Sequence, residues 1–336
     1  MERLNKRQAI DRMSSLGRQG KPFVFIIDFE MKKIIVSEPH RLDETIHIDF
    51  PNFKHNTHSS KANSSFQWSK SPMCLVDYEK GFSKVLQEIN VGNTFLINLT
   101  YPTKVKCAGD LHDIFHSATA KYRMYLEGEF TFFSPETFVK VINGKITTYP
   151  MKGTIDASLP NALEVLLADE KELAEHYTIV DLLRNDLSIV AKEVNVSKFR
   201  YPDYLETNDK TLIQISSEIE GQLPSDYAAR LGEVIFALLP AGSISGAPKK
   251  KTVQIISEAE GSPRGYYTGI AGYFDGRDLD STVMIRFVED TKEGLQYRSG
   301  CGITSQSDLR KEYEEMIDKV YLPMTSKADE KRHDVH

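Results

Sequence analysis

Apolar and polar residues alternate along this 336-residue chain with two different periods. Apolar positions three or four residues apart predict amphipathic helices, whereas short apolar runs such as Phe23 to Ile27 predict strands. The polar stretch at 51–72 is the best candidate for an internal boundary, because Ser, Asn, His and Lys dominate it. In the first half we expect helices at 5–17, 76–91 and 110–126, a strand pair within 22–37, and strands at 94–100, 130–134, 137–142 and 145–149.

The second half continues as blocks of helices and strands, with no repeat of fixed period. Blocks joined by hairpins, instead of strict strand–helix alternation, favour an α+β fold with largely antiparallel sheets. The tail at 325–336 is polar, and we expect it to fray. The remaining elements are predicted as helices at 160–168, 170–186, 225–238, 247–260 and 307–322, strands at 195–200 and 211–222, and three strands within 265–301.

Asn143-Gly144 lies between two β-patterned runs and predicts a type I′ hairpin, since both central residues tolerate a positive φ. Pairing Ile142 with Lys145 places Glu136 and Lys152 at the same end of that hairpin. Strict alternation puts their side chains on opposite faces, but Pro150 is typical of a bulge or a strand end. Two interpretations stay open from spacing alone: a chemical pair, or a surface ion pair worth less than about 1 kcal/mol.

Composition and charge exclude several classes of protein. The net charge is −6 and no run of five basic residues is present, so an extended nucleic-acid footprint is not expected. Uninterrupted apolar stretches are about five residues long, far below the roughly 20 that cross a membrane. The first 20 residues do not resemble a signal peptide, and three distant cysteines fit a reducing compartment. We therefore expect a cytosolic protein that binds neither membranes nor nucleic acid.

Two predicted helices carry paired carboxylates. Glu172 and Glu175 are three residues apart on one, and Glu312, Glu315 and Lys319 share a face of the other. If the pairs face each other, they form an all-oxygen site suited to Mg²⁺. Solvated helix faces are the alternative from spacing alone.

Two further segments could bind anions. Residues 241–249 form a turn of small residues that leads into a helix, whose free N–H groups can hold a carboxylate. The spacing does not match a nucleotide-binding phosphate loop. Arg286 lies in the β-patterned run 282–288, and Gly300 and Gly302 leave room for a substrate beside the backbone. An ordinary turn and a solvent-facing arginine are the alternatives.

Several motifs occur in order between residues 72 and 323. They comprise 92–100, Ser134-Pro135-Glu136, Pro150-Met151-Lys152-Gly153-Thr154, 175–186, 217–221, 242–249, 264–269, Arg286, Gly300-Cys301-Gly302 and 312–319. Together they resemble the chorismate-utilising enzymes, and most closely the aminodeoxychorismate synthases among them. The resemblance implies two packed, largely antiparallel sheets flanked by helices. It also implies one catalytic domain over 1–336, with a shortened N-terminal part at 1–71.

Lys152 carries the finer resemblance, because enzymes that make anthranilate or isochorismate have a small residue at this position. The resemblance implies that Lys152 attacks C2 of chorismate while the 4-hydroxyl group leaves, and that ammonia then adds at C4 and expels the lysine. Glu136 matches the general acid/base. A lysine of ordinary pKa is only about 0.1% neutral at pH 7.4, so we expect its surroundings to lower the pKa of Lys152.

The same resemblance implies the remaining ligands. Glu175 and Glu315 would hold Mg²⁺ at the ring carboxylate of chorismate, with Glu172 and Glu312 beside them. Gln214 stands where many relatives have His, and Asn93 and Leu96 also depart from the family pattern. The expected substrate contacts are Gly153, Thr154 and Gln214 at the ring, and Tyr267, Arg286, Gly300, Gly302 and Lys319 at or near the enolpyruvyl carboxylate.

Two segments of larger relatives have no counterpart in this sequence. We find neither a glutaminase nucleophile nor a lyase segment, so we expect ammonia from a separate glutamine amidotransferase subunit and 4-amino-4-deoxychorismate as the product. The tryptophan-binding Leu-Leu-Glu-Ser motif is also missing. Anthranilate synthase component I and a catalytically silent chorismate-binding subunit are the alternative functions.

Overall fold

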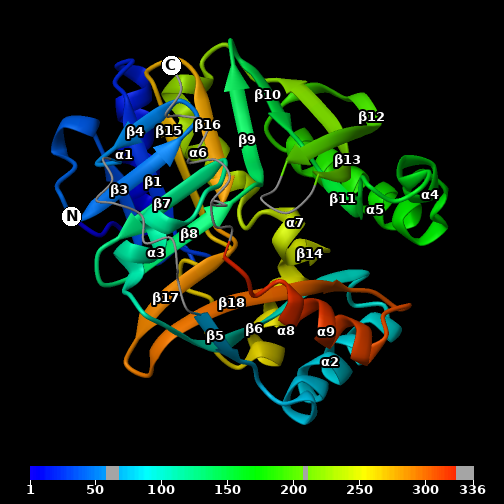
Figure 1. Ribbon diagram of the computed structural model, residues 1–336. Helices are drawn as coiled ribbons and strands as arrows, with labels where there is room; N and C mark the ends of the chain where they lie inside the picture. The colour runs from blue at the N-terminus through cyan, green and yellow to red at the C-terminus, as the bar shows by residue number, and fades with distance from the viewer. Residues whose placement is uncertain (58–67, 207–210, 323–336) are drawn as a thin grey trace, which may run out of the picture.

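The protein is described from a computed structural model that covers residues 1–57, 68–206 and 211–322. Its first sheet, sheet A, contains nine antiparallel strands among these residues (Figure 1). In spatial order they are β11 (Met151–Asp156), β13 (Thr211–Gln222), β10 (Lys145–Thr148), β9 (Thr137–Ile142), β16 (Leu279–Val283), β15 (Ile270–Phe274), β1 (Phe23–Ile27) and β2 (Ile34–Ser37), with β12 (Lys192–Glu206) also paired to β13.

The second sheet, sheet B, is also antiparallel and contains nine strands within the described ranges. Both sheets take strands from the N-terminal 71 residues as well as from later parts of the chain. The order in sheet B is β14 (Gly246–Ala247), β6 (Leu96–Cys107), β18 (Gly294–Ile303), β17 (Phe287–Thr291), β8 (Phe130–Ser134), β7 (Tyr122–Leu126), β3 (Ile46–Phe50) and β4 (Phe53–His55), with β5 (Trp68–Ser71) also paired to β6.

Helices cover the outer faces of the sheets and flank the space between them (Figure 1). The short 3₁₀ segments are η1 (Pro39–Arg41) and η2 (Tyr227–Arg230). The α-helices are α1 (Lys6–Arg18), α2 (Leu75–Asn90), α3 (Leu111–Ser117), α4 (Ala162–Ala168), α5 (Glu170–Ser188), α6 (Leu231–Leu238), α7 (Gly242–Ser245), α8 (Lys249–Glu260) and α9 (Leu309–Asp318).

Strand β1 shows why the sheets pack together. All five of its side chains are fully buried, which explains the continuous apolar run in the sequence. Phe23 and Phe25 belong to the core shared with the helices, whereas Val24 and Ile26 point the other way, into a core shared with β3, β7 and β8 of sheet B. Successive side chains of a strand alternate between faces, so β1 is covered on both sides.

The α+β class with antiparallel sheets is confirmed, but two element predictions are wrong. The helix expected at 110–126 ends at Ser117, and Tyr122–Leu126 is strand β7, which forms a hairpin with β8 around Gly128. Four strands start within 265–301, whereas three were expected there. The single strand expected across Arg286 is in fact two strands, β16 and β17. The predicted tail at 325–336 lies outside the described residues.

One stretch, Tyr227–Ser245, has the length and apolar composition of a membrane-spanning helix. In the structure it is not continuous, because α6 ends at Leu238 and α7 begins only after Pro240. Leu231, Ile235 and Leu238 are buried in the core. Packing inside the protein therefore accounts for the apolarity of this stretch.

Gly246 allows β14 to approach β6 closely. It has a φ of 126°, and a Cβ atom there would lie 1.8 Å from the backbone oxygen of Leu96. Gly246→Ala should therefore lower the free energy of unfolding by at least about 3 kcal/mol. Gly92 is a matched control, since its φ is 79° but nothing lies near its missing Cβ. Gly92→Ala should cost only about 1 kcal/mol in chemical denaturation, and equal losses would contradict the explanation.

Candidate active site

A cavity of about 570 Å³ lies between the two sheets, bordered by α5, α7 and α9. Its size is in the range of small-molecule sites. Every site residue predicted from the sequence lines it, although the chemical role of each stays a prediction. They are Glu136, Lys152, Gly153, Thr154, Glu172, Glu175, Gln214, Tyr267, Arg286, Gly300, Gly302, Glu312, Glu315 and Lys319.

The hairpin between β9 and β10 has the predicted register, with Ile142 opposite Lys145 and positive φ at Asn143 and Gly144. Strand β10 then ends at Thr148, and after Pro150 the chain continues as β11, which pairs with β13 instead of β9. Pro150 thus marks a strand end, as expected from its missing N–H group. This change of partner brings Glu136 and Lys152 into the same cavity.

A bulge follows Lys152. The register of β11 against β13 shifts between Lys152 and Thr154, and Gly153 between them has a φ of 75°. A Cβ atom on Gly153 would lie 2.9 Å from Leu166 and 3.3 Å from a carboxylate oxygen of Glu172. Glycine therefore allows the backbone beside Lys152 to turn close to helix α5.

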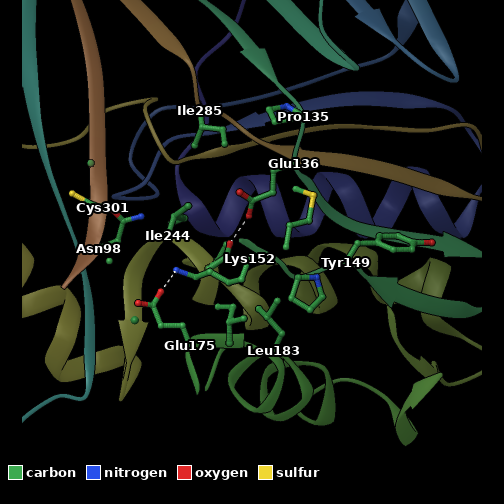
Figure 2. A pocket seen from close by; sticks show the side chains of 18 of the residues that line it. Asn98, Pro135, Glu136, Tyr149, Lys152, Glu175, Leu183, Ile244, Ile285 and Cys301 are labelled. Atoms are coloured by element: carbon green, nitrogen blue, oxygen red, sulfur yellow. Dashed lines mark hydrogen bonds and ion pairs between the residues drawn. The ribbon is translucent and has the colours of Figure 1, made fainter. Parts of the chain in front are cut away.

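Lys152 points across the cavity toward α5. Its Nζ donates a hydrogen bond of 2.9 Å to Glu175, while Glu136 lies on the other side of the lysine in the view of Figure 2. Burial acts to lower the pKa of Lys152, but the carboxylates of Glu175, Glu172 and Glu315 outweigh it, and the pKa is raised. The expectation of a lowered lysine pKa is therefore wrong for this arrangement of side chains.

At Glu136 burial outweighs the neighbouring charges, whereas at Lys152 the charges outweigh burial. Burial raises the pKa of Glu136, against the hydrogen bond from Ser243 and the charges of Arg286, Lys152 and Lys319. The Ser243 hydroxyl donates to Glu136 Oε1 at 2.6 Å, from the first turn of α7. Ser243 was not predicted as a site residue. Its only signal in the sequence is its position in the small-residue turn at 241–249.

Removing the Ser243 hydroxyl should shift the titration of Glu136. The hydrogen bond stabilises the charged carboxylate, so Ser243→Ala should raise the pKa of Glu136 further. If Glu136 acts as an acid, the fall in kcat at high pH should then move to higher pH. Ser243→Thr keeps a hydroxyl and serves as the control. A profile of kcat against pH that is the same in all three proteins would contradict this coupling.

The carboxylates of α5 and α9 line the same cavity. Asp169 and Asp308 cap the N-termini of these helices, and thereby fix where Glu172 and Glu312 fall in the first turns. Burial raises the pKa of both glutamates, with Glu175 and Glu315 respectively adding like-charge repulsion. Neither forms an ion pair within the described residues.

The other two carboxylates, Glu175 and Glu315, form ion pairs with lysines. Glu175 pairs with Lys152 at 2.9 Å and Lys171 at 3.7 Å, and Glu315 pairs with Lys319 at 2.7 Å. Burial acts to raise the pKa of Glu315, but Lys319 outweighs it, and the pKa is lowered. Carboxylate oxygens of Glu312 and Glu315 also lie within 4.8 Å of the Cys301 sulfur and of each other. The wall thus concentrates oxygen donors of the kind that bind hard cations.

Arg286 lies between β16 and β17 with a φ of 53°, not on the face of a strand. The reason is that the backbone turns there as the chain passes from sheet A to sheet B. Its Nε donates to the Tyr321 hydroxyl at 3.2 Å, and its guanidinium stacks over that ring. In the described ranges no carboxylate forms an ion pair with it. A guanidinium that faces a cavity without a charged partner is suited to a substrate carboxylate.

One further group in the cavity, the side chain of Asn98, was not predicted from the sequence. The amide oxygen of Asn98 on β6 is buried and accepts no hydrogen bond among the described residues. A polar side chain in the apolar run Ile97-Asn98-Leu99 is the signal that could have found it. Gly302 lies beside Lys152, since a Cβ atom there would be 4.0 Å from the lysine Nζ.

The cavity therefore combines a buried acid, an amine, clustered carboxylates and a free guanidinium, which is the equipment of an enzyme that acts on a small anionic substrate. Comparison with known families agrees. The chain belongs to the chorismate binding enzyme family, whose pattern matches residues 24–325.

The chain is also similar to individual members of this family. The chain is 47% identical over 316 residues to an uncharacterized PabA-like protein of Haemophilus influenzae, covering 94% of this chain and 96% of that one. It is 32% identical over 262 residues to aminodeoxychorismate synthase component 1 of Bacillus subtilis, covering 72% of this chain and 54% of that one. Anthranilate synthase component I from Streptococcus pneumoniae has a similar structure, with a TM-score of 0.62, 27% identity, and coverage of 80% of this chain and 62% of that one.

Proposed function

We propose that the protein is the chorismate-aminating subunit of an aminodeoxychorismate synthase. The observation that carries the proposal is Lys152, whose amino group faces the cavity between Glu136 and Glu175. The relative from Bacillus subtilis with this activity supports it. An amine at this position can form a covalent bond to the substrate, which a small residue cannot do.

In the proposed reaction the Lys152 Nζ forms a bond to C2 of chorismate, both ring double bonds shift, from C1=C2 and C5=C6 to C1=C6 and C4=C5, and the C4–O bond breaks. Glu136 donates a proton so that the 4-hydroxyl group leaves as water. Ammonia then forms a bond to C4, both double bonds shift back, and the C2–N bond to Lys152 breaks. The raised pKa of Glu136 suits it to hold the proton that the leaving group needs.

Lys152 must lose its proton before it attacks, whereas its carboxylate neighbours raise its pKa. A cation that neutralises Glu175, or that replaces Lys152 as its ion-pair partner, would lower the pKa of Lys152 and so favour loss of its proton. We therefore propose two roles for Glu175: metal binding, and control of the charge of Lys152.

The substrate is a dianion, and the cationic groups of the cavity are suited to it. Arg286 has no carboxylate partner in the described part of the chain, and the adjacent Tyr267 is buried. Lys319 donates to the backbone oxygen of Gly300 at 3.0 Å, which holds it at the cavity wall. We assign the enolpyruvyl carboxylate to Arg286, Tyr267 and Lys319, with Gly300 and Gly302 allowing close approach, and the ring to Gly153, Thr154 and Gln214.

The carboxylates of α5 and α9 fit Mg²⁺, because their donor atoms are oxygens and like-charge repulsion helps to raise the pKa of Glu172 and Glu312. We propose that Glu175 and Glu315 hold the ion, with Glu172 and Glu312 beside them. When bound, Mg²⁺ would neutralise the wall and the ring carboxylate of chorismate, and would weaken the ion pairs that keep Lys152 protonated.

Mg²⁺ should accordingly stabilise the protein. Titration with MgCl₂ is expected to raise the Tm of the wild type, because an ion bound only by the folded state favours folding. Glu315→Gln should shift the titration midpoint to concentrations about tenfold higher or more. Glu314 is exposed and does not line the cavity, so Glu314→Gln is the matched control. Identical titrations for wild type and Glu315→Gln would contradict the assignment.

The proposal also requires a source of ammonia. As the sequence resemblance implies, we infer that a separate glutamine amidotransferase subunit supplies ammonia in the cytosol. Ammonium salts should replace it in vitro.

The test is to identify the product. Protein incubated with chorismate, Mg²⁺ and ammonium should form 4-amino-4-deoxychorismate, which is separated by chromatography and identified by mass and NMR. Anthranilate as the main product would instead assign the protein as an anthranilate synthase. Chorismate binding without turnover, even with a glutaminase present, would assign a catalytically silent subunit. Gln214, Asn93 and Leu96 are the departures that make this second outcome worth measuring.

A further inference from the structure

Three histidine side chains converge on the outer side of sheet B. His47 comes from β3, and His112 and His116 lie four residues apart on α3. Their ring centroids are 4.4 Å to 5.6 Å apart, and one ring nitrogen from each lies within 4.8 Å of the others. Nε2 of His112 is 3.1 Å from Nε2 of His116.

The nitrogens of this histidine cluster are only partly used elsewhere, since the backbone at Glu44 and Asn56 accepts hydrogen bonds from the ring of His47. Nδ1 of His47 is buried and has no hydrogen-bond partner among the described residues. In the tautomers that carry the proton on Nδ1, the lone pairs of both facing Nε2 atoms are directed into the cluster. An unpaired ring nitrogen inside a protein is costly unless a ligand satisfies it.

The surroundings favour neutral imidazoles. Burial, together with the neighbouring His112, lowers the pKa of His116 to about 4, and burial also lowers the pKa of His47. Asp113 on α3 opposes the shift at His116, whereas Arg123 on β7 adds to it. The charge of Arg123 is balanced by Asp49, at 2.6 Å. Neutral imidazole is the form of histidine that binds metals.

Further titratable residues surround the histidine cluster. His55 on β4 lies near enough to His47 to act on its pKa, and the ring of Tyr125 on β7 contacts His47 at its edge. The carboxylates of Asp110 and Asp113 hold each other's backbone N–H groups in the capping box of α3, at 2.9 Å and 3.2 Å. Each acid uses one carboxylate oxygen in this capping box, and carboxylate oxygens of Asp110 and Asp113 also lie within 4.8 Å of a ring nitrogen of His112.

We propose that His47, His112 and His116 form a binding site for a divalent transition metal ion, with Zn²⁺ as its natural occupant. Zn²⁺ binds imidazole nitrogen at about 2.0–2.1 Å, so two ligand atoms of a tetrahedral ion lie a little over 3 Å apart, close to the His112–His116 spacing. Histidines at i and i+4 on a helix present both rings to one ion. Hard cations such as Mg²⁺ prefer oxygen ligands and are disfavoured here.

This site is separate from the active site. None of the three histidines lines the cavity, and Figure 1 shows α3 beside β7 and β8, on the other side of the drawing from α5 and β11. A bound ion would connect β3 to α3 across β7. Its role is therefore structural: it fixes a short helix of 7 residues to the sheet.

Cobalt(II) and Zn²⁺ titrations of the full-length protein test the proposal. Metal-free wild type should bind about one equivalent of Co²⁺ with the visible absorption of a tetrahedral site, and excess Zn²⁺ should displace it. Zn²⁺ should also raise the Tm, because the ion binds the folded state. His112→Gln and His116→Gln should each weaken Zn²⁺ binding by about tenfold or more. Activity with Mg²⁺ should not need Zn²⁺.

His40 is exposed and outside the cluster, so His40→Gln is the matched control and should bind like the wild type. Either glutamine variant suffices if the other fails to fold, since both positions are only half-buried. Absence of Co²⁺ and Zn²⁺ binding by the wild type would overturn the proposal. So would equal binding by the wild type and a folded His112→Gln or His116→Gln protein.

Discussion

Lys152→Ala is expected to lower kcat for amination of chorismate by about 10³-fold or more, because it removes the proposed nucleophile. At this size the effect is about 4 kcal/mol of transition-state stabilisation. Lys152→Met should give the same loss while it keeps most of the buried aliphatic chain. The measurement is steady-state turnover with saturating chorismate, Mg²⁺ and ammonium, with the Tm of each variant as a check of folding.

Lys171 supplies the control for this prediction. It also contacts Glu175, at 3.7 Å, but its side chain is more exposed than that of Lys152. Lys171→Ala should therefore change kcat by less than about tenfold, the range of an electrostatic contact at the surface. If Lys152→Met keeps full activity, or if both lysine variants lose activity equally, Lys152 is not the nucleophile.

Glu136→Gln should lower kcat by about 10²- to 10⁴-fold, the range of general acid catalysis. It should also change the pH dependence. Burial raises the pKa of Glu136, and the protonated fraction of this acid falls as the pH rises through that value. Wild-type kcat should therefore decline on the alkaline side, while deprotonation of Lys152 has the opposite effect.

Glutamine cannot titrate, so the alkaline decline should be absent in Glu136→Gln, and only the rise from Lys152 should remain. The variant keeps the size of the side chain and can still accept the hydrogen bond from Ser243. A variant with the wild-type pH profile at lower rate would show that another group gives up the proton.

Short-range sequence patterns predicted the elements whose structure depends on neighbouring residues in the chain. The Asn143-Gly144 turn set the hairpin register, and the Phe23–Ile27 run was a strand because both of its faces are buried. The helix expected at 110–126 failed where tertiary pairing decides. Tyr122–Leu126 is stabilised as a strand by β3 and β8, which are distant or turn-linked partners that helical spacing does not reveal.

The resemblance found the residues of the cavity, but not the interactions between them. Ser243 and Glu136 are 107 positions apart, and only the fold brings them to 2.6 Å. The direction of the Lys152 pKa depends on carboxylates from two helices, so sequence spacing could not weigh them against burial. Arg286 was assigned to a strand because its apolar neighbours continue across a change of sheet.

The proposed reaction depends on a covalent bond between Lys152 and chorismate. Wild-type protein mixed with chorismate and Mg²⁺, without ammonium, should carry a chorismate-derived adduct when quenched with acid. Peptide mapping by mass spectrometry should place the adduct on Lys152, and added ammonium should discharge it as 4-amino-4-deoxychorismate. Lys152→Met should carry none. Conversion of chorismate and ammonium to that product by a protein that shows no adduct at Lys152 under any of these conditions would contradict the account.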